Sequence, residues 1–235
     1  MSSVYLITGA NRGLGYAIAA ALVQHPQHIV IGAVRSSEKC SILTSLPHHE
    51  TSSIIPIVLP FGSEDILSSQ KNFEEALNAL RNSNPDIHHI DVVIANAGIS
   101  NCHASVVDTP AAAVAEHISV NATFPLILFQ TTWPSLKLSS NPRFVLISSI
   151  VGSVHEVPNT SAFASVAYGM SKAAANYLLR KLGAENTDLS VIAIHPGWIQ
   201  TDLGNGRAIA QGLKEAPVKL ADSVDGILSE VGSPR

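Results

Sequence analysis

The sequence predicts a doubly wound α/β fold of the Rossmann type, a parallel sheet with helices on both faces. Three observations predict it: short β-branched runs recur along the chain, Ala/Leu-rich helical stretches separate them, and a glycine-rich turn follows the first run. The runs are apolar almost throughout rather than alternating, which is typical of parallel strands covered on both faces. Because successive βαβ units cross over with one hand, these strands are expected to join a single sheet.

Six strands are expected, each marked by consecutive Val, Ile or Leu residues. Their ranges are 4–7, 29–33, 54–58, 91–94, 143–148 and 189–195. Helical patterns occupy the intervals and the end of the chain, at 14–24, 64–81, 111–135, 166–184 and 219–231. Pro85 and Pro142 stand in linkers where a helix is expected to have ended, because the residue before a proline disfavours helical geometry.

Two stretches show neither the apolar runs of a strand nor the pattern of a helix. Residues 152–165, rich in Ser, Pro and Asn, predict a loop, and a second break covers residues 204–217. Neither has the composition of an interdomain linker, and the length suits one α/β core. We therefore expect a single dinucleotide-binding and catalytic domain over residues 1–235.

Composition narrows the class of function. The chain is 46% apolar and 14% charged, which supports a buried core and argues against disorder. A net charge of −4, with no local cluster of Lys and Arg, gives no footprint for nucleic acid. We expect no targeting segment and no stretch long enough to span a membrane. Only Cys40 and Cys102 are present, so we expect a cytoplasmic protein without disulfides and without a metal site.

The turn after the first strand has the features of a phosphate site. Missing side chains let backbone approach a pyrophosphate, and free N–H groups at a helix N-terminus favour the anion. An ordinary βα turn is the alternative, but the position after the first strand of a βαβ unit favours a cofactor. The residues expected to bind it are Thr8, Gly9, Asn11, Arg12, Gly13, Leu14 and Gly15.

Further motifs follow the later strands in a fixed order. They are Asn96-Ala97-Gly98, Asn121, Ser148-Ser149, Tyr168-x-x-x-Lys172 and Pro196-Gly197-x-x-x-Thr201. Together with the T-G-x-x-x-G-x-G turn, this ordered set resembles the short-chain dehydrogenase/reductase family over most of the chain. Around 165–185 and 195–204 the sequence is similar to the fungal norsolorinic acid ketoreductase-like branch, which acts on polyketide-type ketones.

The end of the second strand bears on the choice of cofactor. NAD sites usually present Asp or Glu there, whereas the run 33–36 has none and Glu38 comes later. Arg35 could pair with a 2′-phosphate and Ser36 could add a hydrogen bond. Arg12 is the second cation that resembling NADP-dependent members use. We expect NADP(H), with two ordinary surface arginines as the alternative reading.

The resemblance implies the rest of the cofactor site. It places Asn96, with its neighbours Ala97 and Gly98, on the adenosine side. An Asp that holds the adenine is absent at 59–62, and Asp65 comes too late to be assigned. The segment that would cover the nicotinamide carboxamide contributes Pro196, Gly197, Ile199 and Thr201.

Tyr168 and Lys172 are the expected catalytic pair. Four residues apart, they lie on one helix face, and an ammonium beside a phenol lowers the pKa of that phenol. Reduction of a carbonyl needs such a proton donor for the developing alkoxide. The resemblance implies that both residues also contact the cofactor, that Ser149 is the second donor, and that Asn121 holds a water relaying protons to Lys172.

The spacing before Tyr168 leaves the second donor open. Ser149 precedes Tyr168 by nineteen residues, whereas the family's usual, shorter interval would put His155 in its place. We favour an insertion within 152–165, because a loop absorbs length without moving its ends. The alternative donors are His155, Ser148, Ser161 and Ser165.

The expected function is NADPH-dependent reduction of a ketone or aldehyde by hydride transfer, on a polyketide-type or other secondary metabolite. NADP-dependent oxidation of a secondary alcohol is one alternative, and a catalytically silent cofactor-binding scaffold or redox sensor is another. By the resemblance, residues 204–217 would be the substrate lid, a seventh strand is missing after the last helix, and a homodimer or homotetramer is the assembly to consider.

Overall fold

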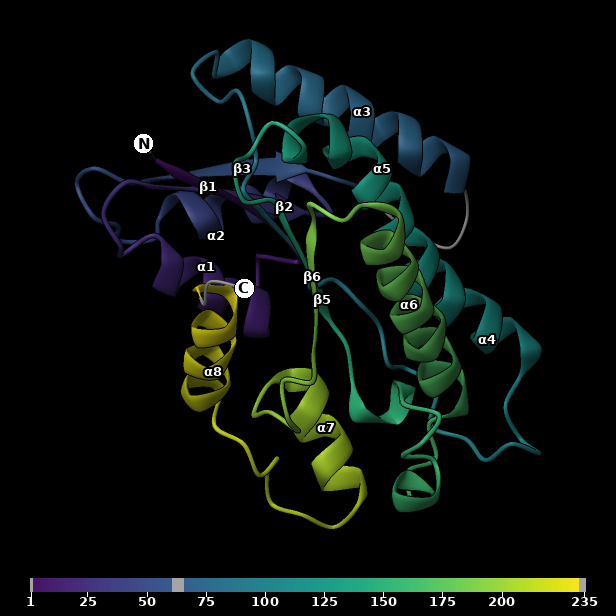
Figure 1. Cartoon of the computed structure of the whole chain (residues 1–235). Coiled ribbons are helices and arrows are strands. Elements are labelled where there is room, and N and C mark those ends of the chain that lie inside the picture. The colour runs from purple at the N-terminus through teal and green to yellow at the C-terminus, as the bar shows by residue number, and fades with distance from the viewer. Residues whose placement is uncertain (1, 61–65, 233–235) are drawn as a thin grey trace.

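One sheet of six parallel strands forms the centre of the structure, a computed structural model that describes residues 2–60 and 66–232. The strand order is β3-β2-β1-β4-β5-β6 (Figure 1). The strands are β1 (Ser3–Thr8), β2 (His28–Val34), β3 (Ser53–Val58), β4 (Val92–Ala95), β5 (Arg143–Ile147) and β6 (Ser190–Ile194). All six coincide with expected strands, so the predicted doubly wound α/β fold is confirmed.

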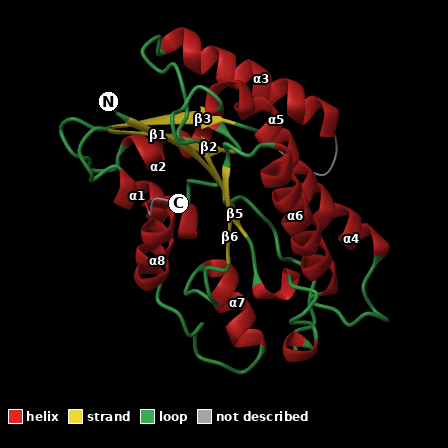
Figure 2. Ribbon diagram, in the orientation of Figure 1, coloured by secondary structure: helices red, strands yellow, loops and turns green. Residues whose placement is uncertain are grey.

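Helices cover both faces of this sheet (Figure 2). One face carries α3 (Ile66–Ser83), α4 (Ala111–Ile118), α5 (Phe124–Leu136) and α6 (Val166–Glu185). The other carries α1 (Gly13–Leu22), α2 (Cys40–Thr44) and α8 (Leu220–Gly232). A further helix, α7 (Asp202–Ala210), lies beyond the carboxyl ends of β5 and β6 (Figure 1).

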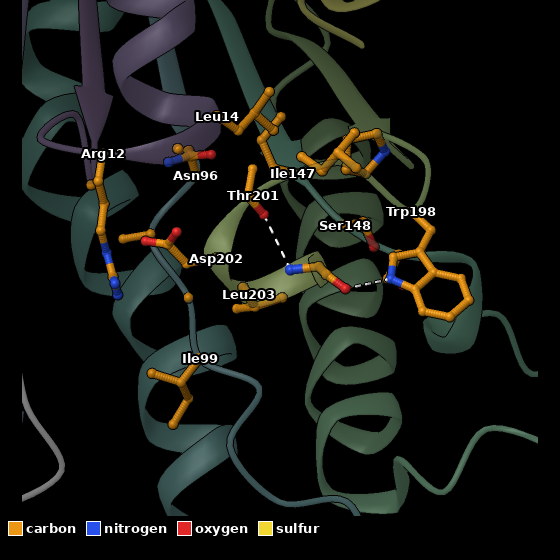
Figure 3. A pocket seen from close by; sticks show the side chains of 18 of the residues that line it. Arg12, Leu14, Asn96, Ile99, Ile147, Ser148, Trp198, Thr201, Asp202 and Leu203 are labelled. Carbon is orange, nitrogen blue, oxygen red and sulfur yellow. Dashed lines mark hydrogen bonds between the residues drawn. The ribbon is translucent and has the colours of Figure 1, made fainter. Parts of the chain in front are cut away.

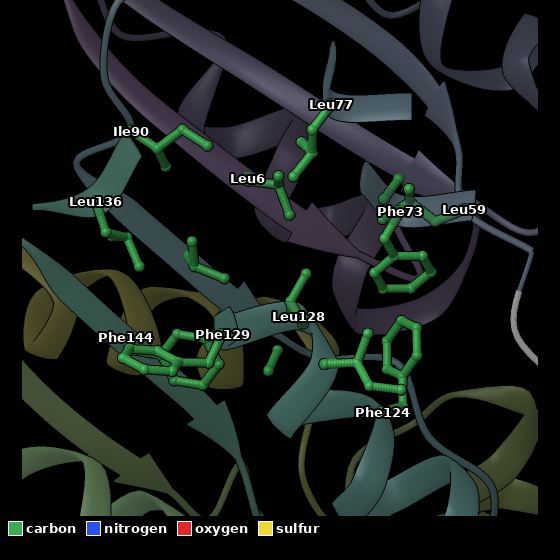
Figure 4. Packing of buried hydrophobic residues seen from close by; sticks show 14 of the residues in the cluster. Leu6, Leu59, Phe73, Leu77, Ile90, Phe124, Leu128, Phe129, Leu136 and Phe144 are labelled. Carbon is green, nitrogen blue, oxygen red and sulfur yellow. The ribbon is translucent and has the colours of Figure 1, made fainter. Parts of the chain in front are cut away.

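Each face of the sheet has its own apolar core. On the α3–α6 side, Phe73 packs edge-on against Phe124 with ring centres 4.8 Å apart, and Phe129 against Phe144 at 5.5 Å (Figure 4). Burying one such side chain contributes about 1.5–3 kcal/mol. Because both faces are covered, the strands can be apolar throughout, which is the pattern the sequence shows.

The direction of the strand order changes between β1 and β4. Starting from β1, the chain first adds strands on one side, then returns to pair β4 with the other side of β1, with Tyr5 opposite Val92 and Ile7 opposite Ile94. Two loops leave in opposite directions at such a point and open a crevice beyond the carboxyl ends of the strands. A ligand site is therefore expected next to the ends of β1 and β4.

Two helical expectations need correction. The break expected over 204–217 is wrong in its first part, because α7 begins at Asp202 and includes Gly204 and Gly206. The Thr201 hydroxyl caps this helix by accepting a hydrogen bond from the Gly204 N–H at 3.2 Å. The single helix expected over 111–135 is interrupted by a π-helical turn at Ser119–Thr123.

The combined helix Ala111–Leu136 also corrects the expectation that no segment has the length of a membrane span. It is 26 residues long, and an 18-residue window of it has a mean hydropathy of 1.4, which would suffice by length and composition. Half of that window is buried inside the protein, where α4 packs against α6 and α5 against α3. Its apolar character is accounted for by this packing, as in the core helix of an α/β sheet.

Candidate active site

A pocket lies at the carboxyl edge of the sheet and brings together most of the expected site residues. Figure 3 shows Arg12 and Asn96 at one side, Trp198 at the other and Thr201 between them. The expected residues that line it are Gly9, Asn11, Arg12, Gly13, Leu14, Arg35, Asn96, Ala97, Gly98, Ser149, Tyr168, Lys172, Pro196, Gly197, Ile199 and Thr201. The expected residues outside its lining are Thr8, Gly15, Ser36 and Asn121.

The glycine turn is held open by its neighbours. Gly9 has a φ of +67°, which suits glycine, and a Cβ on Gly15 would lie 2.4 Å from the Gly9 carbonyl oxygen. The Thr8 hydroxyl accepts hydrogen bonds from the N–H groups of Asn96 and Ala97, at 3.1 and 3.0 Å. Thr8 and Gly15 therefore shape the turn and lie outside the pocket lining, and their contact with a cofactor stays a prediction.

The backbone of this turn leaves room for a dinucleotide. The turn has no side chain at Gly9 or at Gly13, both of which have a positive φ. The N-terminus of α1 follows directly. Arg12 and Arg35 are exposed and line the same pocket. Ser36 precedes a short 3₁₀ turn, Ser37–Lys39, instead of lining the pocket. The glycine turn suits an anionic cofactor, and the positive charge of Arg12 and Arg35 would lie beside the adenosine end of that cofactor.

Tyr168, Ser149 and Lys172 meet at the ends of β5 and α6. Burial raises the pKa of the Tyr168 phenol to about 12, and the neighbouring Ser149 side chain lowers it by a smaller amount. Lys172 is buried, and burial lowers its pKa to about 8. The arrangement is a protonated phenol with a hydroxyl partner, next to a desolvated amine.

The expected effect of Lys172 on the phenol is not seen. The Lys172 Nζ lies 5.6 Å from the centre of the Tyr168 ring and donates a hydrogen bond to the Ile147 carbonyl oxygen at 2.7 Å. Desolvation therefore dominates at both groups and pushes both toward their neutral forms. Sequence spacing places the two residues on one helix face, but it does not tell where the amine is anchored.

The alternative second donors point elsewhere. The Ser148 hydroxyl donates to the Asn176 side-chain oxygen at 2.6 Å. Ser161 and Ser165 donate to the carbonyls of Pro158 and Phe163 in their own loop. His155 is exposed and does not line the pocket. The geometry thus favours Ser149, and the extra residues of 152–165 form turns, including a 3₁₀ turn at Pro158–Thr160, as an insertion would.

Asn121 lies in the π-helical turn and is buried. Its side chain accepts a hydrogen bond from the Ile99 N–H at 2.8 Å and donates to the Ile99 carbonyl and the Ser171 hydroxyl, both at 2.9 Å. A Cβ on Gly98 would lie 3.0 Å from the Asn121 oxygen and 3.7 Å from the Lys172 Nζ, so both side chains adjoin Gly98. Asn121 fixes the Ile99 backbone, and its water relay stays a prediction.

Several pocket residues were not expected from the sequence. One of them is Trp198, whose indole N–H donates a hydrogen bond to the Gly204 carbonyl oxygen at 2.9 Å and so connects the segment after β6 to α7 (Figure 3). The other unexpected residues lie at the ends of β4, β5 and β6 and at the start of α7, next to the motifs, and this position could have indicated them. They are Ile99, Ile147, His195, Asp202 and Leu203.

The fold and this pocket define a nucleotide-binding oxidoreductase of the doubly wound class. The short chain dehydrogenase family matches residues 3–212, and the chain belongs to that family. It is 37% identical to the norsolorinic acid ketoreductase of Dothistroma septosporum, covering 97% of this chain and 84% of the relative, and 34% identical to that of Emericella nidulans, covering 97% and 85%.

Solved structures share the fold. An NADPH-bound carbonyl reductase from chicken fatty liver superposes with a TM-score of 0.80 at 24% identity, covering 99% of this chain and 92% of that one. The carbonyl reductase Sniffer of D. melanogaster gives a TM-score of 0.80 at 23% identity, covering 100% and 92%. At this identity the likeness establishes the arrangement of strands and helices.

Proposed function

We propose that the protein is a cytoplasmic, NADPH-dependent carbonyl reductase that converts a ketone or aldehyde of polyketide type into the alcohol. One observation carries the proposal: Tyr168 and its neighbour Ser149 line the same pocket as the glycine turn. A proton donor and a dinucleotide cradle in one cavity are the two requirements of carbonyl reduction by hydride transfer. The ketoreductase names of the fungal relatives support the same reaction class.

Each residue of the active site has its own role in this reaction. NADPH, when bound, supplies the hydride. Tyr168 and Ser149 hold the carbonyl oxygen, and the Tyr168 phenol gives its proton to the oxygen as negative charge develops there. Lys172, anchored on Ile147, stands under the Tyr168 ring, where it can contact the nicotinamide ribose.

The same residues serve both directions of the reaction. The Tyr168 phenol donates its proton in reduction, and the corresponding phenolate accepts one in oxidation. The preference for NADPH, which rests on the residues at the end of β2, is what favours reduction in the cell over oxidation of an alcohol.

The choice of NADPH rests on charge. Arg12 and Arg35 line the pocket at the glycine turn, and the backbone after β2 carries no carboxylate until Glu38. A 2′-phosphate placed between two guanidinium groups gains charge-assisted hydrogen bonds that NADH cannot make. The NADPH-bound carbonyl reductase from chicken fatty liver, which shares the fold, supports this choice.

The proposal is tested by incubating the purified protein with NADPH or NADH and a panel of aromatic ketones, quinones and aldehydes. Loss of reduced nicotinamide absorbance should require a carbonyl and proceed faster with NADPH. The product should be the alcohol, identified by mass spectrometry. If NADPH binds while no carbonyl is reduced, the scaffold or sensor reading replaces the enzyme.

A further inference from the structure

Arg207 of α7 is a half-buried cation close to the reactive end of the pocket. Its guanidinium carbon lies 5.1 Å from the centre of the Phe163 ring. Phe163 in turn packs edge-on against Trp198, with ring centres 5.9 Å apart, and Trp198 lines the pocket. Two aromatic rings and one guanidinium thus form a continuous wall from the pocket outward.

Arg207 lies on the face of α7 that adjoins the pocket. Leu203 lines the pocket, and Arg207, four residues later on the same helix face, lies outside the lining. The adjacent face, with Gly204 and Ala208, is buried, and a Cβ on Gly204 would overlap the Ile199 carbonyl oxygen. Because α7 sits this tightly on the segment after β6, the direction of Arg207 is fixed by the fold.

The positive charge of Arg207 acts on the pKa values of neighbouring side chains, that of Tyr168 included. It lowers the pKa of Tyr168, after the larger effects of burial and Ser149, and it also contributes to the lowered pKa of His103. Burial lowers the pKa of Arg207 itself, and the Tyr168 side chain raises it by a smaller amount. Among the described residues, no ion pair joins Arg207 to an Asp or Glu.

We propose that Arg207 is a specificity-determining residue that binds an anionic oxygen group, a carboxylate or phenolate, on the aromatic body of the substrate. A half-buried guanidinium without a carboxylate partner gains most from an anion that arrives with the ligand. Phe163 and Trp198 offer ring faces and edges to the aromatic body beside it. This inference rests on the proposed function only in treating the occupant as the substrate.

The test compares two probes that differ in charge alone, 2-naphthoate and 2-naphthamide, binding to the NADPH complex by calorimetry. The naphthoate should bind about tenfold more tightly to the wild-type protein, as a hydrogen bond to a charged group predicts. Arg207→Gln should abolish this preference, and Arg207→Lys should retain part of it. Arg180→Gln removes an exposed charge far along α6 and should leave the preference unchanged.

The same comparison is then made in turnover, with 4-acetylbenzoate and its methyl ester. Arg207→Gln should raise the KM of the acid about tenfold while the ester and the NADPH affinity change little. Equal losses on both substrates, or weaker NADPH binding, would overturn the assignment and point to support of Tyr168 or of the cofactor. If neither ketone is reduced but the naphthoate preference depends on Arg207, the proposed function fails and the anion site stands.

Discussion

The amine of Lys172 is hydrogen-bonded to the carbonyl oxygen of Ile147, the last residue of β5, at 2.7 Å. This contact places a desolvated cation at the end of a buried strand, below the Tyr168 ring. The folded chain therefore holds the pKa of Lys172 near 8, against an ordinary value of 10.5. Burial in the fold therefore disfavours the charged form of Lys172, although the residue is part of the site.

Replacing Lys172 with Met should stabilise the protein while abolishing its activity. The lowered pKa corresponds to about 3 kcal/mol of destabilisation at neutral pH, and leaving the Ile147 carbonyl unpaired costs about 1 kcal/mol, so the expected gain is about 2 kcal/mol. Between pH 8 and 10.5 the unfolded chain binds more protons than the folded one, so wild-type stability rises with pH there and the gain shrinks.

Urea unfolding at pH 7 and pH 10 measures this difference. Lys181→Met is the matched control, because Lys181 is on the same helix, exposed and paired with Glu185 at 2.7 Å. Its effect should stay within about 0.5 kcal/mol at both pH values. A Lys172→Met variant no more stable than the wild type at pH 7 would show that the buried amine carries no such cost.

Tyr168→Phe should lower kcat for carbonyl reduction by about 10²–10⁴-fold, the usual contribution of a general acid. The ring is retained, so its packing and the NADPH affinity should change little. Steady-state kinetics and a fluorescence titration with NADPH separate the two effects. Unchanged turnover would remove Tyr168 from the mechanism.

Ser149→Ala should lower kcat by about 10²-fold, because one hydrogen-bond donor to the developing oxyanion is lost. Ser148→Ala is the control: it lies next in sequence and also lines the pocket, but its hydroxyl bonds Asn176. Its kcat should stay within about threefold of the wild type. If the larger loss falls on Ser148, the second donor has been assigned to the wrong serine.

Arg35→Asp should shift the cofactor preference toward NADH by at least about tenfold, because a carboxylate repels a 2′-phosphate and can bind the ribose hydroxyls. Arg180→Asp, an exposed charge reversal on α6, controls for net charge. The ratio of kcat/KM for NADPH and NADH is the measurement. An unaltered ratio would mean that Arg35 does not read the phosphate.

The strands and the motif residues could be predicted because each depends on local pattern. Apolar runs mark β1 to β6, and Gly9, Tyr168 and Lys172 occupy fixed offsets from strand or helix ends. The short helix α2 and the start of α7 were missed, since Thr201 and the glycines 204 and 206 suggested a loop. Here the tertiary fit of Gly204 against Ile199 overrides the low helix propensity of glycine.

The site itself needed the three-dimensional structure at two points. That the Lys172 amine is anchored on the Ile147 carbonyl depends on where β5 ends relative to α6. The wall of Arg207, Phe163 and Trp198 joins three segments with no common motif. Sequence spacing reports neighbours within one helix or turn, and these contacts cross between elements.

The chain crosses over β1 before it forms β4. As a result, each half of the sequence contributes only some of the residues that line the pocket. Gly9 and Arg12 come from the first crossover, whereas Tyr168 and Thr201 come from the last third of the chain. A dinucleotide lying across the pocket would act as a removable cross-link between these two parts. At a cofactor concentration of 100 times its Kd, this link adds about 2.7 kcal/mol to the free energy of unfolding. Cofactor supply in the cell would thereby set the lifetime of the protein as well as its rate.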